Sequence, residues 1–555
     1  MAQFYAAPGY HGRLLPGGPV NKLGFDDPGD RLLGRCLRRQ AEANPDRDFL
    51  VAGETHYSYG RVNELANAMA SGFGSLGVAR GDTVAVMMES CPDYVWSTLG
   101  LNKLGAIWVP TNTDYKGQWL RESLEDSRAK VLVVDEALLP RVAEAGGELP
   151  FDHIVVRGDP KASPLAAPAI ALAELERAPG KEPDDADLFL GDTAAILWTS
   201  GTTGRSKGVM QSHQVWIRAA VDGANNSHLR EGEVIYSCLP MYQSAAWVAN
   251  VYRALVSGVP CAIDERFSVH EFWDRCRYYG ATMVFTLGAM HIFLWQQPEK
   301  PDDADNPVRS AGMVPMPDPM IEPFKKRFGI DHIHQGYGQS EVMGLLARRP
   351  GKTYKAGSLG EASDGIEVCL LDDRDFPVAP GGVGEFCIRP TEPYAIFNGY
   401  YHDPEATVRA WSNLWYHSGD LGRQDEDGEY FFVDRKKDFI RYKGRNISSF
   451  QVEAAFMAHE AVAQCAAHAV TSAELEAEAE MKLCVVLKPG QSATAEELCG
   501  FVNETAPYFF VPRYIEFMTE LPSTPTGRVQ KYKLRERGVT PETWDAKQAG
   551  FVVKR

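Results

Sequence analysis

Short apolar segments alternate with helical segments along this chain, and this alternation limits the possible folds more than any other feature. It begins with a strand pattern at residues 83–88 and a helical pattern at 92–104. Two further strand patterns, 106–110 and 130–135, enclose a helical one at 118–126. Strands that are apolar throughout and separated by helices indicate a parallel sheet with both faces covered. The pattern therefore predicts a doubly wound α/β layer.

The same alternation starts again after residues 157–190, a stretch rich in Pro, Ala and Asp that we interpret as a linker. Strand and helix patterns then follow in turn at 233–240, 244–257, 260–264, 268–279 and 282–286. We therefore expect two α/β layers in one large domain.

The remaining third of the chain has shorter and more varied segments. Residues from about 356 to 434 are rich in strands and Gly turns, which predicts a small sheet or barrel. Residues from about 438 to 536 alternate helix and strand on a smaller scale, which is typical of a compact α+β domain. The predicted domains are an N-terminal extension at 1–30, a large domain at 31–436 and a smaller C-terminal domain at 437–555.

The overall charge and the cysteine spacing limit the class of function. The net charge of −17 argues against a nucleic-acid-binding surface, which needs clustered Lys and Arg. No apolar run is long enough for a transmembrane helix, and the N-terminus lacks the pattern of a signal peptide. The ten cysteines include no CxxC pair, so we expect buried thiols in a cytoplasmic protein.

The segment LWTSGTTGRSKGVMQSH, residues 197–213, carries the clearest chemical signal. Its glycines allow tight turns that point N–H groups inward, its hydroxyl side chains add donors, and Lys207 adds a mobile positive charge. These groups suit a polyphosphate. The segment is not a P-loop, because a glycine follows Lys207 where that motif needs Ser or Thr. The alternative is an ordinary Ser/Thr/Gly loop, which the length of the pattern TSGTTGxxKG disfavours.

Several ordered motifs resemble the adenylate-forming superfamily of acyl-CoA synthetases, peptide-synthetase adenylation domains and luciferases. Beside the phosphate loop, they are LPMYQS (239–244), GYGQSE (336–341), YHSGDLG (416–422), DRKKDFIRYKGRNIS (434–448) and LPSTPTGRVQKYKLRE (521–536). The resemblance covers residues from about 35 to 540. Within the superfamily, YQS and TPTGRVQKYKLRE are similar to carnitine/crotonobetaine–CoA ligases and fatty-acid-transport-type synthetases.

The resemblance implies an enzyme that joins a carboxylic acid to coenzyme A with ATP and Mg²⁺, releasing AMP and pyrophosphate. Lys207, Glu341 and Arg528 would be catalytic, and Glu341 with Thr202 would hold Mg²⁺. Asp420 would accept the ribose hydroxyls of the nucleotide, and Lys437 would be the hinge of a mobile C-terminal domain. The residues implied in binding ATP or coenzyme A are Thr199, Ser200, Gly201, Thr202, Thr203, Gly204, Tyr337, Gly338, Ser340, Asp420, Arg435, Arg441, Lys443 and Gly444.

The resemblance also implies an acyl pocket, which the apolar and aromatic residues suit for an aryl, alicyclic or quaternary-ammonium acid. The alternative is that these side chains belong to the core. The candidates are Gln243, Trp247, Gly288, Met290, Ala311, Gly312, Met313, Gly336 and Met343.

Two residues depart from the family pattern. Arg528 stands where the family has a lysine, and a planar guanidinium does not match a compact ammonium at a tight site. We expect slower adenylation, or help from Lys531. Gln243 stands where His is common, and it cannot titrate near neutral pH.

Three interpretations of function remain open. The first is the CoA ligase, and the second is an adenylating enzyme with an amine or carrier-protein acceptor. The third is a non-catalytic adenylate- or acyl-binding protein that has lost the lysine at position 528. The acid and the oligomeric state, monomer or homodimer, are not determined by the sequence.

Overall fold

The computed structural model describes residues 24–25, 27–147, 149, 151–199, 206–227, 229–436, 438, 440–442, 445–471, 479–523 and 529–554. They form two compact units that do not follow chain order. Unit 1 contains the described residues up to 199 and residues 206–367 and 389–411. Unit 2 contains residues 368–388 and the described residues from 412 onward.

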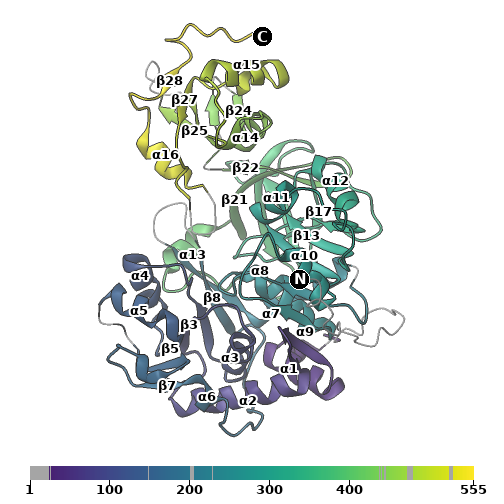
Figure 1. Ribbon diagram of the computed structural model, residues 1–555, viewed down its shortest axis with the longest axis vertical. Helices are drawn as coiled ribbons and strands as arrows, with labels where there is room; N and C mark the ends of the chain where they lie inside the picture. The colour runs from purple at the N-terminus through teal and green to yellow at the C-terminus, as the bar shows by residue number, and fades with distance from the viewer. Residues whose placement is uncertain are drawn as a thin grey trace. The chain divides into compact units, whose positions relative to one another are not determined.

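The first sheet of unit 1 has seven strands in the order β7-β6-β5-β3-β4-β8-β9, parallel except for the β8–β9 pair (Figure 1). The strands are β3 Thr83–Met87, β4 Ile107–Pro110, β5 Val131–Asp135, β6 His153–Arg157, β7 Ala169–Ala171, β8 Thr193–Thr199 and β9 Lys207–Ser212. Every residue of β3 and β5 is buried, as expected for strands covered on both faces.

Helices cover both faces of this sheet. Alternate strand residues face α4 and α5 on one side, where Met87 packs with Leu120 and Leu139. The other side faces α2 and α3, where Val86 packs with Met69. The helices are α1 Leu33–Ala43, α2 Tyr59–Ser75, α3 Pro92–Lys103, α4 Gly117–Ser127, α5 Leu139–Ala145, α6 Leu172–Leu175 and α7 His213–Asn226.

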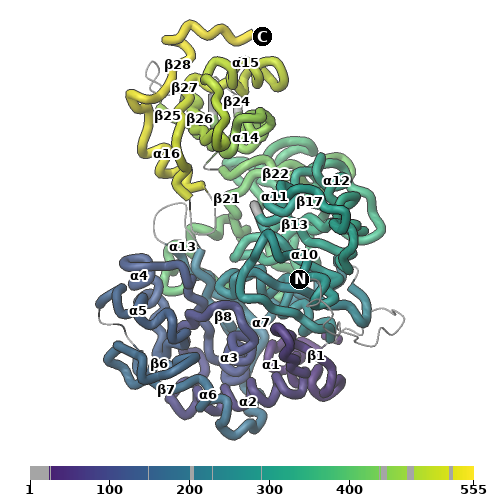
Figure 2. Tube along the Cα trace, viewed as in Figure 1, coloured from purple at the N-terminus to yellow at the C-terminus, as the bar shows by residue number. Residues whose placement is uncertain are grey.

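The second sheet of unit 1 has the order β14-β13-β12-β10-β11-β1-β2. Its strands are β1 Asp48–Ala52, β2 Thr55–Ser58, β10 Ile235–Ser237, β11 Cys261–Ile263, β12 Met283–Leu287, β13 Ser310–Val314 and β14 His332–His334. Leu50 of β1 pairs with Cys261 of β11, so a segment from the purple start of the trace joins a later sheet (Figure 2). Sequence patterns did not predict this exchange.

The helices that follow the strands of this second sheet include one irregular segment. The predicted helix at 244–257 is α8 Ser244–Ala246, a π-helical turn at Trp247–Val251 and α9 Tyr252–Ser257. The other helices of unit 1 are α10 Phe272–Tyr279, α11 Ala289–Gln296, α12 Asp318–Phe328 and α13 Pro404–Ala410. Short strands β15 Gly336–Tyr337, β16 Leu346–Ala347 and β17 Ser358–Ala362 form an antiparallel ribbon.

Unit 2 combines antiparallel strands with an α+β fold. Strands β18, β19, β21 and β22 lie next to one another in the order β22-β21-β19-β18, and a second sheet has the order β25-β26-β27-β28. The elements are β18 Ile366–Leu371, β19 Val383–Pro390, β20 Trp411–Ser412, β21 Trp415–Gln424, β22 Tyr430–Arg435, β23 Ile440–Tyr442, β24 Arg445–Ile447, α14 Ser449–Met457, β25 Val462–Thr471, β26 Ala479–Leu487, α15 Ala495–Thr505, β27 Tyr514–Phe517, α16 Lys531–Arg537 and β28 Trp544–Asp545. A capping box of Thr494 and Glu497 starts α15.

The predicted α/β class with a smaller α+β part is confirmed, but the predicted linker at 157–190 needs correction. It contains β7 and α6, and Leu172 and Leu175 of α6 are buried in the core. The apolar run that forms these elements is short, so the surrounding Pro, Ala and Asp residues concealed it.

Candidate active site

The phosphate-loop segment begins and ends on paired strands. Thr199 at the end of β8 pairs with Lys207 at the start of β9, and the Thr199 hydroxyl donates to the Lys207 carbonyl oxygen at 3.3 Å. The predicted loop residues Ser200, Gly201, Thr202, Thr203 and Gly204 lie outside the described residues. The Lys207 side chain is half-buried, and its Nζ lies 4.6 Å from the centre of the Tyr400 ring.

The GYGQSE segment folds into a tight turn between β15 and β16. The Leu345 N–H donates to the Tyr337 carbonyl oxygen at 2.8 Å, which closes the turn. A side chain at Gly338 would meet the backbone nitrogen of Gly344 at 2.9 Å, so only glycine fits there. The Ser340 carbonyl oxygen accepts a hydrogen bond from the Gln211 side chain on β9. This contact joins the turn to the strand that carries Lys207.

Glu341 ends this turn and contacts the same tyrosine as Lys207. The Tyr400 hydroxyl donates to Glu341 Oε1 at 2.8 Å, and the Phe397 N–H donates to the Glu341 carbonyl oxygen at 3.0 Å. The structure therefore brings together two predicted catalytic residues, Lys207 and Glu341, on opposite parts of one aromatic side chain. Tyr400 itself was not predicted as a site residue.

Asp420 and Arg435 come together in unit 2. They are cross-strand partners on β21 and β22, and Arg435 Nε lies 3.6 Å from Asp420 Oδ1. The Asp420 side chain is 5% exposed, whereas that of Arg435 is 41% exposed. The Asp420 N–H donates to the Ser418 hydroxyl at 3.1 Å, so the Ser-Gly-Asp turn is fixed locally.

A buried carboxylate supports this turn. Glu385 on β19 accepts a hydrogen bond from the Gly419 N–H at 2.8 Å. Its other oxygen lies 2.9 Å from Lys436 Nζ and 3.2 Å from His417 Nδ1. Burial lowers the pKa of Lys436, but the hydrogen bonds and charge interactions with Glu385 and Asp373 together outweigh burial, so the pKa is raised overall.

Glu385 and His417 also lie near Cys387, a combination of residue types that ligates metals. Cys387 Sγ lies 3.4 Å from His417 Nδ1, and the three ligand atoms lie within 4.8 Å of one another. Burial raises the pKa of the Cys387 thiol. Because Lys436 already balances the charge of Glu385, we interpret the group as a support for the turn.

The predicted hinge, the proposed coenzyme A contacts and the family lysine position fall mostly outside the described residues. Lys437, Lys443, Gly444 and Arg528 lie outside the described residues, and only the backbone of Arg441, in β23, is described. Lys531, which could replace the missing family lysine, is engaged elsewhere. Its Nζ lies 2.7 Å from Glu453 Oε1 and donates to the Ser449 hydroxyl at 2.6 Å.

The predicted acyl-pocket residues divide into two groups. Trp247, Ala311, Met313 and Met343 are buried in hydrophobic clusters, which matches the alternative that they belong to the core. Trp247 Nε1 also donates to the Met241 carbonyl oxygen at 2.7 Å. Of the others, Gln243, Met290 and Gly336 are half-buried, Gly288 is exposed, and Gly312 is buried under Phe285. Their role in an acyl pocket stays a prediction.

Sequence reasoning missed Tyr400, Glu385 and the role of His417. Each of them makes its contacts with residues that are far away in the sequence, so the spacing of residues within one segment could not predict these contacts. For Tyr400 the one available signal was an aromatic pair after Gly399, in a segment that the motif comparison did not include.

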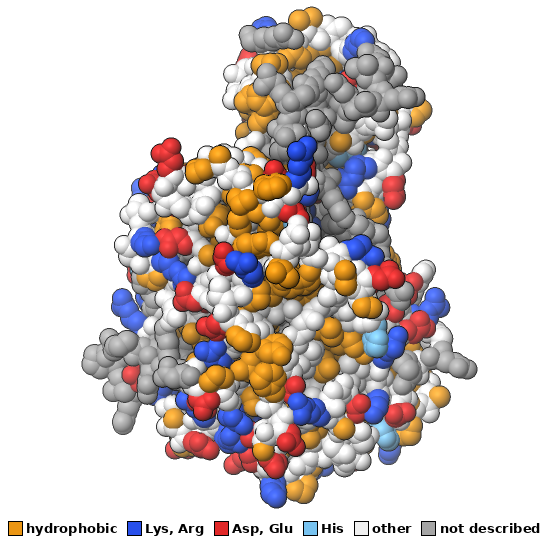
Figure 3. All heavy atoms as spheres, turned by 180° about the vertical axis from the view of Figure 1, so that it is seen from behind, with side chains coloured by type: hydrophobic (Ala, Val, Ile, Leu, Met, Phe, Trp, Pro, Cys, Tyr) orange, Lys and Arg blue, Asp and Glu red, His pale blue; other side chains and the backbone are white. Residues whose placement is uncertain are grey.

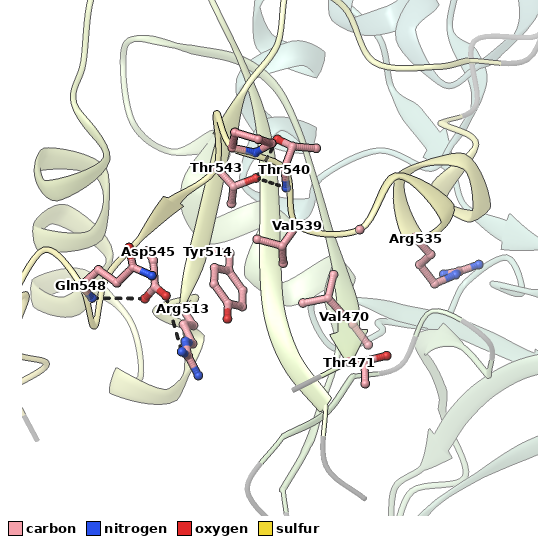
Figure 4. A pocket seen from close by; sticks show the side chains of 13 residues that line it. Val470, Thr471, Arg513, Tyr514, Arg535, Val539, Thr540, Thr543, Asp545 and Gln548 are labelled. Carbon is pink, nitrogen blue, oxygen red and sulfur yellow. Dashed lines mark hydrogen bonds and ion pairs between the residues drawn. The ribbon is translucent and has the colours of Figure 1, made fainter. Parts of the chain in front are cut away.

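A pocket of about 730 Å³ lies within unit 2, away from these residues in sequence (Figure 4). Its arginines already contact carboxylates: Arg513 lies 3.1 Å from Glu480, and Arg535 lies 2.7 Å from Asp438. None of the predicted site residues lines it. On the face drawn in Figure 3, acidic, basic and hydrophobic side chains are intermixed over the coloured surface. No helix in the described part of the chain is long and apolar enough to span a bilayer.

Comparisons with known proteins agree with the motifs. Residues 37–401 match the AMP-binding enzyme family, and residues 451–528 match the AMP-binding enzyme C-terminal domain. The crotonobetaine/carnitine–CoA ligase of Salmonella enteritidis is 31% identical over 484 residues, which cover 86% of this chain and 93% of that protein. The protein of the same name from Salmonella paratyphi A is 30% identical over 520 residues, which cover 91% of this chain and 100% of that protein.

Solved structures show the same fold. An anthranilate–CoA ligase in complex with anthranoyl-AMP has a TM-score of 0.81 and 25% identity, with 91% of this chain and 97% of that chain covered. A benzoate–CoA ligase from Burkholderia xenovorans has a TM-score of 0.79 and 24% identity, with 91% and 98% covered. With the family matched over most of its length, the chain belongs to the AMP-binding enzymes.

Proposed function

We propose that this chain is an AMP-forming acid–thiol ligase that converts a carboxylic acid to its coenzyme A thioester. One observation carries the proposal: Lys207 and Glu341, from separate motifs, both contact Tyr400. A cation and a carboxylate that contact the same side chain without pairing suit a nucleotide triphosphate and its divalent metal ion. The curated relatives support this activity, since their names describe CoA ligases.

The first half-reaction makes an acyl adenylate. A carboxylate oxygen of the acid attacks the α-phosphorus of ATP, the bond to the β-phosphate oxygen breaks, and pyrophosphate leaves. Two negatively charged reactants must meet, so positive groups are needed at the phosphates. Lys207 is proposed to bind phosphate oxygens there, and Arg528 is proposed to take the place of the family lysine.

The donors of this chain fit Mg²⁺. A single carboxylate, Glu341, with a hydroxyl such as that of Thr202, leaves the remaining positions to phosphate oxygens and water, as is usual for this ion. When bound, Mg²⁺ supplies neutralising charge to the phosphates. Glu341 would hold it, and Tyr337 and Ser340, in the same turn, are proposed to contact the adenine and the phosphate.

The nucleotide sugar is proposed to bind Asp420. An ionised carboxylate accepts two O–H donors at once, which suits the two ribose hydroxyls. Arg435, at 3.6 Å, orients the carboxylate and adds a positive charge.

The second half-reaction transfers the acyl group. The sulfur of coenzyme A attacks the acyl carbonyl carbon, the bond to the AMP oxygen breaks, and the thiol proton is lost to solvent. Lys437 is the proposed hinge, and Arg441, Lys443 and Gly444 are the proposed contacts for coenzyme A. We also place the reaction in the cytoplasm, which the ten free cysteines support.

The test is pyrophosphate release from ATP with a panel of acids: aliphatic, aryl, steroid-like and betaine, each with and without coenzyme A. We expect one class to raise the release and to give AMP and an acyl-CoA. Glu341→Gln should abolish the release, while Glu322→Gln, at an exposed helix position, should not. Release without thioester would instead indicate another acceptor, such as an amine. Nucleotide binding without release from any acid would refute the ligase.

A further inference from the structure

Tyr400 contacts two proposed catalytic groups, Lys207 and Glu341. Tyr400 is 6% exposed, so contacts with the surrounding protein determine where its ring lies. The face of its ring lies 4.6 Å from Lys207 Nζ, and its hydroxyl donates to Glu341 Oε1 at 2.8 Å. The ring face thus contacts a positive group, and the hydroxyl of the same side chain contacts a negative one.

The backbone around Tyr400 is fixed to the strand that carries Lys207. Tyr400 forms an antiparallel bridge with Val209 of β9. The Tyr401 N–H donates to the Gly208 carbonyl oxygen at 2.7 Å, and the Met210 N–H donates to the Gly399 carbonyl oxygen at 3.0 Å. The backbone that carries the tyrosine ring is therefore paired with the strand that carries Lys207.

A third contact fixes Tyr400 from the other side. Its N–H donates to the Thr407 hydroxyl at 2.9 Å, and that hydroxyl donates to the Asp403 carbonyl oxygen at 3.0 Å, at the start of α13. Since both the backbone and the ring are held, the hydroxyl reaches Glu341 from one direction.

The arrangement matters because Lys207 and Glu341 carry opposite charges. A direct ion pair would neutralise the ammonium that phosphate needs and the carboxylate that a metal ion needs. A ring contact leaves the ammonium charged, and a hydrogen bond from a neutral hydroxyl leaves the carboxylate charged.

Resting on the proposed function, we propose that Tyr400 is a positioning residue that keeps Lys207 and Glu341 apart and aimed at Mg-ATP. Its ring holds the lysine, and its hydroxyl sets the carboxylate. The two parts can be tested separately, because phenylalanine keeps the ring and loses only the hydroxyl.

The test compares Tyr400→Phe and Tyr400→Leu in the full-length protein by calorimetric titration with ATP, once with Mg²⁺ and once with EDTA. Tyr400→Phe should weaken Mg-ATP binding about tenfold, the lower range for a hydrogen bond to a charged group. Its affinity for metal-free ATP should not change. Tyr400→Leu should weaken both, because the ring under Lys207 is also lost.

Tyr401→Phe is the matched control. The same hydroxyl is removed one residue along, from a ring that packs against a small apolar cluster, so both affinities should stay as in the unaltered protein. Thermal melting shows whether each variant is folded.

The outcomes separate this proposal from the function it rests on. If the unaltered protein does not bind Mg-ATP, the proposed function fails. If it binds Mg-ATP and Tyr400→Phe binds it equally well or more tightly, the positioning role is refuted. Equal weakening of metal-free and metal-bound ATP in Tyr400→Phe would also refute it.

Discussion

In unit 1 the charges of Lys207 and Glu341 meet across a neutral tyrosine, whereas in unit 2 the Glu385 carboxylate contacts an ammonium and an imidazole directly. The contacts with the tyrosine do not neutralise either charge. The second arrangement satisfies its charge within the protein and uses it to hold the Gly419 amide. Lys207 and Glu341, which we propose for ligand binding, thus both contact a neutral ring, while the Glu385 carboxylate, which supports a turn, is paired with charged groups of the protein.

The largest expected effect is on chemistry in unit 1. Lys207→Met should lower the rate of pyrophosphate release about 10²- to 10³-fold, the loss typical of one charge-stabilising group. Because Lys207 forms no ion pair with any residue that the structure describes, stability should change by less than about 0.5 kcal/mol. Steady-state kinetics and thermal melting measure the two effects, and Lys161→Met, at an exposed site, is the control. A large drop in the melting temperature of Lys207→Met would show that Lys207 supports the fold, which would contradict the contrast drawn between the two units.

Unit 2 should behave in the opposite way. Glu385→Gln removes the buried carboxylate charge that Lys436 and His417 share and leaves them their contacts with Asp373 and Asp375, which should lower stability by about 1–3 kcal/mol. The KM for ATP should rise through the loosened Asp420 turn, with kcat nearly kept. Urea unfolding and kinetics measure both, and Glu426→Gln, exposed in the turn after β21, is the control. Unchanged stability together with a large fall in kcat would show that Glu385 acts in the chemistry instead.

The two units should share one response to pH. Burial lowers the pKa of His213 on α7 and of His468 on β25, each to about 4 from an ordinary value of 6.5. Below pH 6.5 the unfolded chain binds protons that the folded one does not, so stability is full above that pH and is lost as the pH falls toward 4. At pH 5 each histidine should cost about 2 kcal/mol relative to pH 7.

Amide hydrogen exchange, read in α7 and β25 at both pH values, measures this response for each unit. His468→Gln should flatten the pH dependence in β25 and leave that of α7 unchanged. An equal slope in β25 before and after the substitution would count against His468 as its source.

The smallest expected effect is at residue 528, which belongs neither to the Tyr400 contacts of unit 1 nor to the Glu385 contacts of unit 2. Arg528→Lys introduces the ammonium group that the family has at this position and keeps the positive charge. The rate of pyrophosphate release should therefore rise by less than about tenfold. Kinetics with the best acid of the panel measures it, and Arg374→Lys, at an exposed position in unit 2, is the control. A fall in rate would show that the guanidinium is adapted to this site.

Local pattern was sufficient for much of the fold. Strands such as β3 and β5 are apolar because both of their faces are covered, so their apolar sequences directly indicate buried strands. The sequence also identified the motif residues Lys207, Glu341, Asp420 and Arg435, because each lies in a segment whose residue types suit a nucleotide. In the structure Lys207 and Glu341 contact the same tyrosine, and Asp420 pairs with Arg435 across two strands.

Long-range pairing accounts for what the sequence did not reveal. Tyr400 gains its contacts only because residues 397–401 pair with β9 and with Glu341. Glu385 reaches Gly419 only because β19 pairs with β21. No spacing rule within one segment describes such contacts, since they depend on which strands become neighbours.

The pairing of β1 with β11 has a consequence for synthesis of the chain. Leu50 is made long before its partner Cys261, and at 5–20 residues per second the ribosome needs roughly 10–40 s to reach it. During that interval the β1–β2 hairpin has no sheet to join, and its apolar side must be shielded by α1, α2 or a chaperone. The second sheet thus closes only after a delay fixed by translation, and slowing the ribosome between these codons would lengthen the exposure of the hairpin.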